Sequence, residues 1–413
     1  MRKKRFLTIV IAAAFLLSFA AMNASAEKVF KLGTMGPYTG PAAQSGANQL
    51  AGTKQKFEEI GWKIGDYKIE HIMIDSQSDP AKGANAFTEA VERKGMQAVV
   101  GGWHSSVAIA CADLEVKYGI PHITTGAAAL PLTEKIKEVP GYHLKFWSYP
   151  AMSTVLYYQF FENLIKTNQW KLKDKRVALS AEETDWGRDW IIAAKDNLKK
   201  YGWEVVAEDY VQVGQTDFYP LLSRYKDLGV PLVMTTNTAA ASISAYVKQI
   251  REVGLKGVFV ADGLTWIGEW YKLTGRSSDG FMDLNVIWTE KSDPLRKKIK
   301  KNFGFDPTPS ACGLAYDAAG LFIKIAERAI EKHGELTSKT LLNVIKDEVM
   351  TGKLTYGWDD GGVIMKEYRY TPETYPDPQT DAEHWFMPVV QFKSGKQFAV
   401  FPESVKMKEF ELK

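Results

Sequence analysis

The sequence predicts an α/β protein built from parallel sheets that are covered by helices on both faces. Short apolar runs alternate with helical patterns from residue 29 to residue 261, and unbroken alternation of this length is typical of repeated βαβ units. Glycine and proline end many of these elements, as Gly119 and Pro121 do after one helix. The chain is also too long for one ordinary domain of about 100 to 200 residues, so we expect two lobes.

The first 26 residues have the three parts of a secretory signal. Basic residues from Arg2 to Arg5 precede an apolar run from Phe6 to about Ala21, and Ala24-Ser25-Ala26 follows. The apolar run is shorter than the roughly 20 residues that a membrane-spanning helix needs. We therefore expect a periplasmic protein whose signal is cleaved after Ala26, and the alternative is an uncleaved anchor.

The charge balance argues against several classes of partner. The signal takes four of the 52 basic residues with it, which leaves 48 basic against 49 acidic residues. A balanced chain has no net attraction for nucleic acid or for an anionic membrane.

Cys111 and Cys312 are the only cysteines. In an oxidising compartment they either pair or stay free, because the sequence does not show whether they are close.

The expected elements follow in a regular order. Strands are expected at residues 29–35, 67–74, 98–100, a short run ending at 125, 144–148, 176–180, 203–208, 232–235 and 257–261. Helices are expected at residues 80–93, 107–118, 152–167, 186–201, 294–303, 311–332 and 337–347. One further helix is expected to end at residue 60, one to begin after residue 217, and one to end at residue 253. Asp79 is expected to cap the helix that begins at Pro80. The tail predicts antiparallel strands with turns at 360–362 and 394–395, and the Pro-rich piece 370–378 predicts a surface loop.

The strongest site signal lies between Gln97 and Ala129. One strand ends at Gly101-Gly102, and either Ser105 or Ser106 is expected to cap the next helix, whose free N–H groups would favour a small anion. A second strand ends in the same unit, and open α/β sheets place their ligands at such carboxyl ends. The candidate residues on the two loops are Trp103, His104, Ser105, Ser106, Thr125, Gly126, Ala127 and Ala128. The alternative interpretation is an ordinary piece of α/β core.

Signatures of catalysis and metal binding are missing from the sequence. The six histidines form no HxH or HExxH pair, and neither a Walker glycine loop nor a GxSxG motif occurs. His104 alone lies on a candidate site loop, where we expect a hydrogen-bonding wall rather than a base. The sequence therefore favours a binding protein over an enzyme, with no metal and no cofactor.

A series of motifs carries a family resemblance. They are KLGTMGPYTGPAAQSG, IDSQSDPAKGANA, AVVGGWHSS, GIPHITTGAAAL, Asp185-Trp186-Gly187, REVGLKGVFVADG and the helix start at Ala315-Tyr316-Asp317. In this order, across nearly the whole mature chain, they resemble the periplasmic solute-binding proteins of the branched-chain amino-acid (Leu/Ile/Val-binding) type of ABC importers.

The resemblance implies a type I periplasmic-binding-protein fold, with two Rossmann-like lobes joined by three crossing strands. The crossings would lie near 142–150, 285–289 and 350–356. Lobe one would then combine residues 27–145 and 288–352, and lobe two residues 146–287 and 353–413. Such a protein is expected to be a monomer that closes around a small-molecule ligand by hinge motion and delivers it to ABC permease subunits.

The resemblance also implies roles for individual residues. Ser105 and the loop 126–128 would hold a ligand carboxylate, Ser45 and Trp186 would complete the walls, and Asp262 would pair with a ligand ammonium. The alternative role of Asp262 is a helix cap. Asn237 and Trp266 are further candidates in the second lobe. Two departures bear on the ligand: Ala128 stands where the family usually has threonine, and Asp262 is offset by about one position.

The aromatic content adds a second clue to the ligand. The chain has 12 tryptophans, and Trp103, Trp186 and Trp266 all fall on expected carboxyl-end loops. Such rings suit a flat or aromatic acid, so this ligand class stands beside a branched-chain or other hydrophobic amino acid. A solute-binding protein for import leads, a ligand-sensing subunit of the same fold is the alternative, and a secreted enzyme is a distant third.

Overall fold

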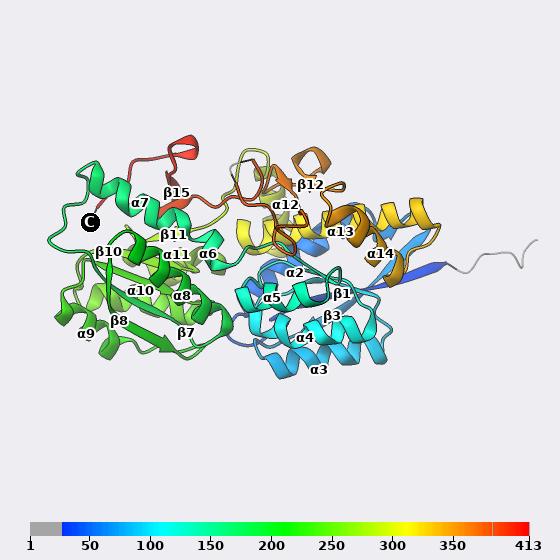
Figure 1. Ribbon diagram of the computed structural model, residues 1–413, viewed down its shortest axis with the longest axis horizontal. Coiled ribbons are helices and arrows are strands. Elements are labelled where there is room, and N and C mark those ends of the chain that lie inside the picture. Colours follow the sequence, from blue (N-terminus) through cyan, green and yellow to red (C-terminus); the bar gives the residue numbers. More distant parts are fainter. Residues whose placement is uncertain (1–26, 382, 413) are drawn as a thin grey trace, which may run out of the picture.

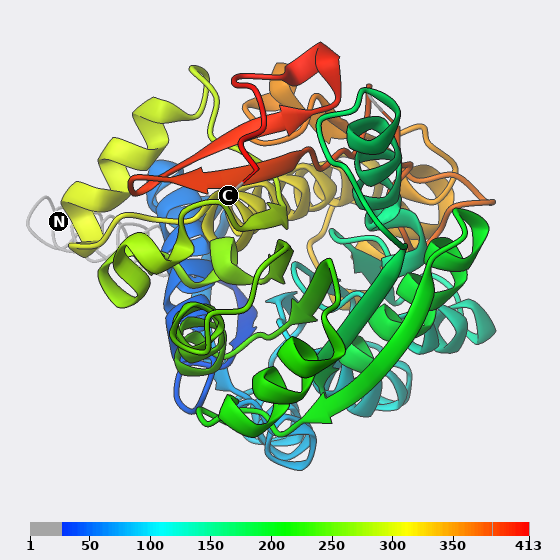
Figure 2. The ribbon, with the colours of Figure 1, turned by 90° about the vertical axis from the view of Figure 1, so that its left-hand side faces the viewer.

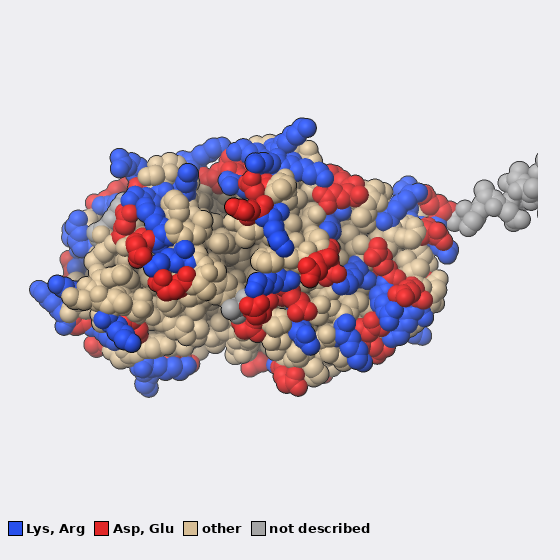
Figure 3. All heavy atoms as spheres, turned by 90° about the horizontal axis from the view of Figure 1, so that it is seen from above, with Lys and Arg blue, Asp and Glu red and all other residues tan. Residues whose placement is uncertain are grey.

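The computed structural model describes residues 27–381 and 383–412, which form two α/β lobes lying side by side (Figure 1). The expected signal, residues 1–26, lies outside the described residues, which begin at Glu27, directly after the expected cleavage site. In the described part, no helix is long and apolar enough to cross a membrane. Lysine and arginine are interspersed with aspartate and glutamate over the face seen in Figure 3.

Lobe one, as we define it, is built on a six-stranded sheet with the order β2-β3-β1-β4-β5-β6. Its strands are β1 (Lys28–Gly36), β2 (Lys63–Ile64), β3 (Tyr67–Asp75), β4 (Ala98–Gly101), β5 (His122–Thr124) and β6 (His143–Lys145), and its helices are α2 (Ala43–Glu59), α3 (Pro80–Glu92), α4 (Ser105–Tyr118) and α5 (Leu130–Glu138). Apart from the short β2, the strands are parallel. The chain order reverses between β1 and β4, where doubly wound sheets bind ligands.

Lobe two is built on a seven-stranded sheet with the order β15-β14-β11-β10-β9-β7-β8. Its strands are β7 (Arg176–Glu182), β8 (Glu204–Val211), β9 (Leu232–Thr236), β10 (Val258–Asp262), β11 (Met282–Leu284), β14 (Val389–Lys393) and β15 (Lys396–Phe401). Its helices are α6 (Pro150–Ser153), α7 (Val155–Lys166), α8 (Asp185–Lys200), α9 (Tyr219–Leu228), α10 (Ala240–Glu252) and α11 (Trp270–Thr274), with 3₁₀ turns η1 (Leu264–Ile267) and η2 (Gly275–Ser278). The antiparallel pair β14–β15 extends the sheet at one edge (Figure 2).

The chain returns to lobe one after β11. Helix α12 (Asp293–Phe303), the π-helical turn η3 (Pro309–Gly313) and α13 (Leu314–His333) contact α2, and α14 (Ser338–Val344), the π-helical turn η4 (Ile345–Val349), β12 (Tyr356–Gly357), η5 (Trp358–Asp360) and β13 (Glu367–Tyr368) follow. The buried Asp317 carboxylate accepts the N–H groups of Val363 and Ile364 and the hydroxyl of Tyr368. A last 3₁₀ turn, η6 (Glu403–Val405), lies near the C-terminus.

Residues 353–378 pack on lobe one, although the sequence assigned them to lobe two. Lys145 donates to Asp377 at 2.8 Å in a buried ion pair, and the Tyr375 hydroxyl accepts the N–H of Gly141 at 2.7 Å. We therefore propose that the third crossing lies between Pro378 and Val389 rather than near 350–356. The Pro-rich piece 370–378 was expected at the surface, but its second half is buried by these contacts.

Most expected elements are present, with local differences. Asp79 accepts the N–H of Lys82 at 2.9 Å and caps α3, as expected. Neither Ser105 nor Ser106 caps α4, because His104 occupies the N-cap position and α4 begins at Ser105. The helix expected at 152–167 is interrupted at Thr154, between α6 and α7. Cys111 and Cys312 are both free and buried.

Candidate ligand-binding site between the lobes

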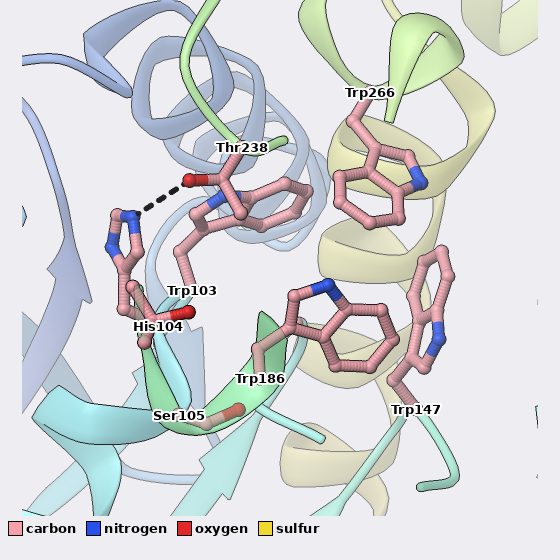
Figure 4. Close-up of a pocket in the computed structure, with 9 residues that line it drawn as sticks. Trp103, His104, Ser105, Trp147, Trp186, Thr238 and Trp266 are labelled. Carbon is pink, nitrogen blue, oxygen red and sulfur yellow. Dashed lines mark hydrogen bonds between the residues drawn. The ribbon is translucent and has the colours of Figure 1, made fainter. Parts of the chain in front are cut away.

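A pocket lies between the lobes, at the carboxyl ends of strands from both sheets (Figure 4). It is lined by Trp103, His104, Ser105, Gly126, Trp147, Thr184, Trp186, Thr238 and Trp266. The tryptophan rings pack closely on one another, so the walls of the pocket nearly meet in this conformation.

The glycine pair after β4 positions the lobe-one wall. Gly101 and Gly102 have φ of 104° and 121°, which a residue with a side chain rarely adopts. The carbonyl of Gly102 accepts the N–H of Gly126 at 2.9 Å and the side-chain amide of Gln49 at 3.0 Å. These bonds join the loops after β4 and β5, so the wall residues that follow each strand are held together.

Ser105 links the same two loops through its hydroxyl. Its Oγ accepts the N–H groups of Ala128 and Ala129, each at 3.0 Å. Because the oxygen already accepts twice, its own hydrogen is available as a donor, and Ser105 lines the pocket. The site thus offers one preorganised hydroxyl donor at the start of α4, where the helix dipole favours an anion.

His104 faces the second lobe. Its Nε2 lies 3.2 Å from Thr238 Oγ1, and the Thr238 hydroxyl donates to Glu182 at 2.7 Å. The Thr238 oxygen therefore accepts from His104, which places the imidazole proton on Nε2. Burial lowers the pKa of His104 to about 4. The ring is consequently neutral at neutral pH, and it lines the pocket.

Four tryptophans surround the remaining space. Trp266 packs edge-on against Trp103, Trp147 and Trp186, with ring centroids 5.7 to 5.8 Å apart. The indole N–H of Trp186 donates to Thr236 at 3.0 Å and fixes that ring. The indole N–H groups of Trp103, Trp147 and Trp266 are buried with no partner within the described residues. The walls are therefore aromatic, with neutral hydrogen-bonding groups.

Among the residues that the structure describes, no carboxylate lines this pocket. Asp262 is only 3% exposed, and its Oδ2 accepts the indole N–H of Trp190 at 2.6 Å. Burial, and then the neighbouring Asp283, raise the pKa of Asp262 well above its usual range. Burial likewise raises the pKa of Asp283 to about 7. The residue expected to bind a ligand ammonium is thus part of a carboxyl pair outside the lining of the pocket.

Six of the candidate residues line the pocket: Trp103, His104, Ser105, Gly126, Trp186 and Trp266. Others lie in its surroundings. The Ser45 hydroxyl donates to the Trp266 carbonyl at 3.4 Å, and Ser106 Oγ accepts the N–H of Asp185 at 3.3 Å. Thr125 donates to Gly102 and Asn237 to Thr235. Ala127 and Ala128 are buried.

The sequence interpretation missed three lining residues: Trp147, Thr184 and Thr238. Trp147 was counted inside a strand expected to run to residue 148, whereas β6 ends at Lys145. Thr184 and Thr238 follow β7 and β9 by two residues each. Attention to every residue just after an expected strand would have included them.

One buried group in the described part of the chain has metal-ligand chemistry. Atoms of Glu115, His122 and His143 lie within 4.8 Å of one another. The two Nδ1 atoms lie 2.7 and 2.9 Å from the Glu115 carboxylate, which are hydrogen-bond distances. Burial opposes ionisation of Glu115, but the two histidines outweigh it and lower its pKa to about 2. Because His122 Nε2 also lies 2.6 Å from the carbonyl oxygen of Gly101, the group supports the site loop.

Comparison with known proteins identifies the class to which this two-lobed architecture belongs. A model of the family described as periplasmic binding protein matches residues 29–369. The match covers most of the chain, so the chain belongs to the periplasmic binding protein family. This result confirms the resemblance and the fold predicted from the motifs, and it identifies a binding protein rather than an enzyme.

Particular relatives agree with this family. The leucine-, isoleucine-, valine-, threonine- and alanine-binding protein of Pseudomonas aeruginosa is 25% identical over 375 residues, 88% of this chain and 94% of the relative. A solute-binding protein of an ABC transporter from R. palustris, solved with 4-hydroxybenzoate, has a TM-score of 0.74 at 21% identity and covers 93% of this chain and 98% of its own. The branched-chain amino acid transporter substrate-binding protein of Streptococcus pneumoniae, solved with isoleucine, has a TM-score of 0.69 at 19% identity, with coverages of 90% and 98%.

Proposed function

We propose that this protein captures a small aromatic carboxylate in the cleft between its lobes and delivers it to an ABC importer. The observation that carries the proposal is the lining of the pocket: four tryptophans and the Ser105 hydroxyl surround it, and no residue in the described part of the lining has a carboxylate. An amino-acid ligand carries an ammonium group, and burying that charge without an anionic partner is costly. An aromatic acid has no such group to satisfy.

The wall chemistry suits each part of this ligand. A ring can stack on the indoles, with each aromatic pair contributing about 0.5 to 1.5 kcal/mol beyond area burial. The carboxylate can accept from the Ser105 hydroxyl near the start of α4, and hydrogen bonds to an ionised group are stronger than neutral ones. The 4-hydroxybenzoate in the R. palustris relative supports this class, whereas the amino-acid-binding relatives support the alternative.

A calorimetric comparison of two ligands tests the proposal. The purified mature protein is titrated with benzoate and, separately, with leucine. Binding of benzoate without binding of leucine is the expected result. Binding of leucine alone would overturn the aromatic assignment and favour the hydrophobic amino acid. Mass spectrometry of any small molecule that stays bound after purification identifies the natural ligand independently.

Membership of the periplasmic binding protein family implies export to the periplasm. Cleavage after Ala26 and a monomeric state belong to this proposal, and the intact mass of the secreted protein together with its mass by light scattering tests both. A ligand-sensing role is the alternative. It would be favoured if deletion of the gene abolished a response to the ligand while uptake continued.

A further inference from the structure

The start of α5 depends on the opposite lobe for one of its hydrogen bonds. Its N-cap residue is Ala129, whose side chain supplies no acceptor, and the first turn contains no acidic residue. Helices need acceptors for their first N–H groups. The N–H of Leu130 donates to Asp189 Oδ2 at 2.7 Å, and Asp189 lies on α8 of lobe two.

This bond acts on the loop that lines the ligand pocket. The loop 126–129 ends where α5 begins, and Ser105 accepts the N–H groups of Ala128 and Ala129 from lobe one. The Ala128 carbonyl accepts from the Lys145 ammonium at 3.1 Å. Lobe one therefore supplies partners for the rest of the loop, whereas the next N–H, that of Leu130, finds its acceptor across the cleft.

A reciprocal contact lies at the start of α8. Thr184 caps α8 from within its own lobe, but the N–H of Asp185 donates to Ser106 of lobe one at 3.3 Å. Asp189 lies three residues after Trp186, so the two share one face of α8. Trp186 lines the pocket while Asp189 meets α5, and one helix thus carries both a ligand wall and a cross-lobe contact.

The Asp189 carboxyl group is buried where it meets α5. Asp189 is 6% exposed. Burial raises the pKa of Asp189, and the Leu130 N–H and the buried Lys145 offset this rise only in part. When the lobes part, the Asp189 carboxylate regains water and the Leu130 N–H loses its acceptor. Hinge opening of the cleft would therefore break this bond.

We propose that Asp189 is a positioning residue that strengthens ligand capture by capping α5 across the closed cleft without touching the ligand. The choice of benzoate as the probe rests on the proposed function, whereas the geometry of the Asp189 contact does not depend on it. Loss of a charge-assisted hydrogen bond of this kind weakens a closed complex about 10- to 100-fold. Because hinge opening of the cleft would break this bond, the loss should appear as faster dissociation with little change in association.

The test compares Asp189→Asn and Asp189→Ala with Asp196→Ala, a control at an exposed acidic residue of the same helix. Calorimetry and stopped-flow tryptophan fluorescence measure the binding of benzoate, or of leucine if benzoate gives no heat. An error in the proposed ligand class can therefore be told apart from an error in the role of Asp189. Both Asp189 variants should bind more weakly and release the ligand faster, and Asp196→Ala should match the parent. If Asp189→Ala does not fold, the near-isosteric Asp189→Asn provides the comparison.

Two further readouts distinguish positioning from general stability. The melting temperature of the ligand-free protein should be unchanged in Asp189→Asn, because an open cleft leaves Asp189 in water. Amide hydrogen exchange over residues 130–138 should be faster in that variant than in Asp196→Ala, whatever molecule the purified protein holds. An unchanged dissociation constant, or an equal fall in melting temperature with and without ligand, would overturn the proposal.

Discussion

Ser105 combines two roles in the site, because its oxygen accepts from two loop N–H groups while its hydrogen remains free to bind a ligand. We expect Ser105→Ala to weaken benzoate binding roughly 10- to 100-fold, since a hydrogen bond to a charged group is worth about 1.5 to 3 kcal/mol. The change also leaves the N–H groups of Ala128 and Ala129 without their acceptor, so the melting temperature should fall as well. Calorimetry and thermal unfolding measure the two effects.

The control for this variant is Ser106→Ala, which removes only the bond to the Asp185 N–H. It should weaken binding less than Ser105→Ala, because Ser106 is absent from the pocket lining. An unchanged dissociation constant for Ser105→Ala would remove Ser105 from the ligand site and leave it a purely structural role.

Trp186 lines the pocket and also belongs to the large buried hydrophobic cluster of the molecule. It is 7% exposed, lines the pocket and contacts Trp266 across it. We expect Trp186→Ala to cost about 1 to 3 kcal/mol of binding free energy, measured by calorimetry, with a much smaller loss of stability in the ligand-free protein. The comparison is Trp170→Ala, because Trp170 packs against Phe161 and Trp203 in the core. Normal ligand affinity in folded Trp186→Ala, together with a steep fall in melting temperature, would contradict the wall assignment.

At the same scale, the sequence predicted the positions of lining residues better than it predicted their contacts. Ser105 and Trp186 follow glycine-rich or acidic loops at strand ends, and that location was sufficient to select them. Asp262 also follows a strand, but the direction of its side chain depends on the local path of the backbone after β10. The pairing of Asp262 with Asp283, which is distant in the sequence, could not be deduced from local pattern.

Among the elements, β10 and β11 carry the buried carboxyl pair and position the turn that holds Trp266. Asp283 accepts the N–H groups of Gly263 and Thr265 and the Thr265 hydroxyl. Burial raises the pKa of Asp283 from 3.8 to about 7, so the folded state holds a proton that the unfolded state releases near pH 4. The unfolded state then binds fewer protons between about pH 4 and 7, and the free energy of unfolding falls as the pH rises through this range.

We expect Asp262→Asn to flatten this pH dependence, because burial also raises the pKa of Asp262 and an amide has no proton to release. Melting temperatures at pH 5 and pH 8 measure the effect. Asp317, whose pKa burial raises to about 6, contributes a similar slope in every variant, so the relevant quantity is the difference from the parent. The exposed Asp113→Asn provides the control. A slope equal to that of the parent would show that the pair does not titrate in this range.

Over the whole molecule, the alternation of short strands and helices predicted parallel sheets covered by helices, the chain length predicted two lobes, and the family resemblance supplied their Rossmann-like form. Each strand is a local apolar run, and the right-handed crossover rule leaves few ways to join such runs. The third crossing that we propose differs from the one expected from the sequence, because the chain after residue 352 has short strands and prolines with no periodic signal. Its attachment to lobe one depends on Lys145 and Asp377, a buried ion pair between residues 232 positions apart.

The arrangement of the lobes predicts that the molecule becomes more compact on binding its ligand. Hydrogen bonds cross the cleft from Gln44 to the Gly268 carbonyl, from the Ser45 hydroxyl to the Trp266 carbonyl and from His104 to Thr238. In an open molecule these groups return to water, and the tryptophan walls separate. A ring that fills the pocket favours the closed form because it contacts walls from both lobes at once, and a ligand shifts such an equilibrium by its differential affinity for the two states.

Small-angle scattering should therefore show a smaller radius of gyration with saturating benzoate than with sodium chloride at the same ionic strength. The Trp186→Ala variant should need more benzoate to reach the same radius. An unchanged radius, in a sample that calorimetry shows to be saturated, would mean that capture does not involve closure of the lobes.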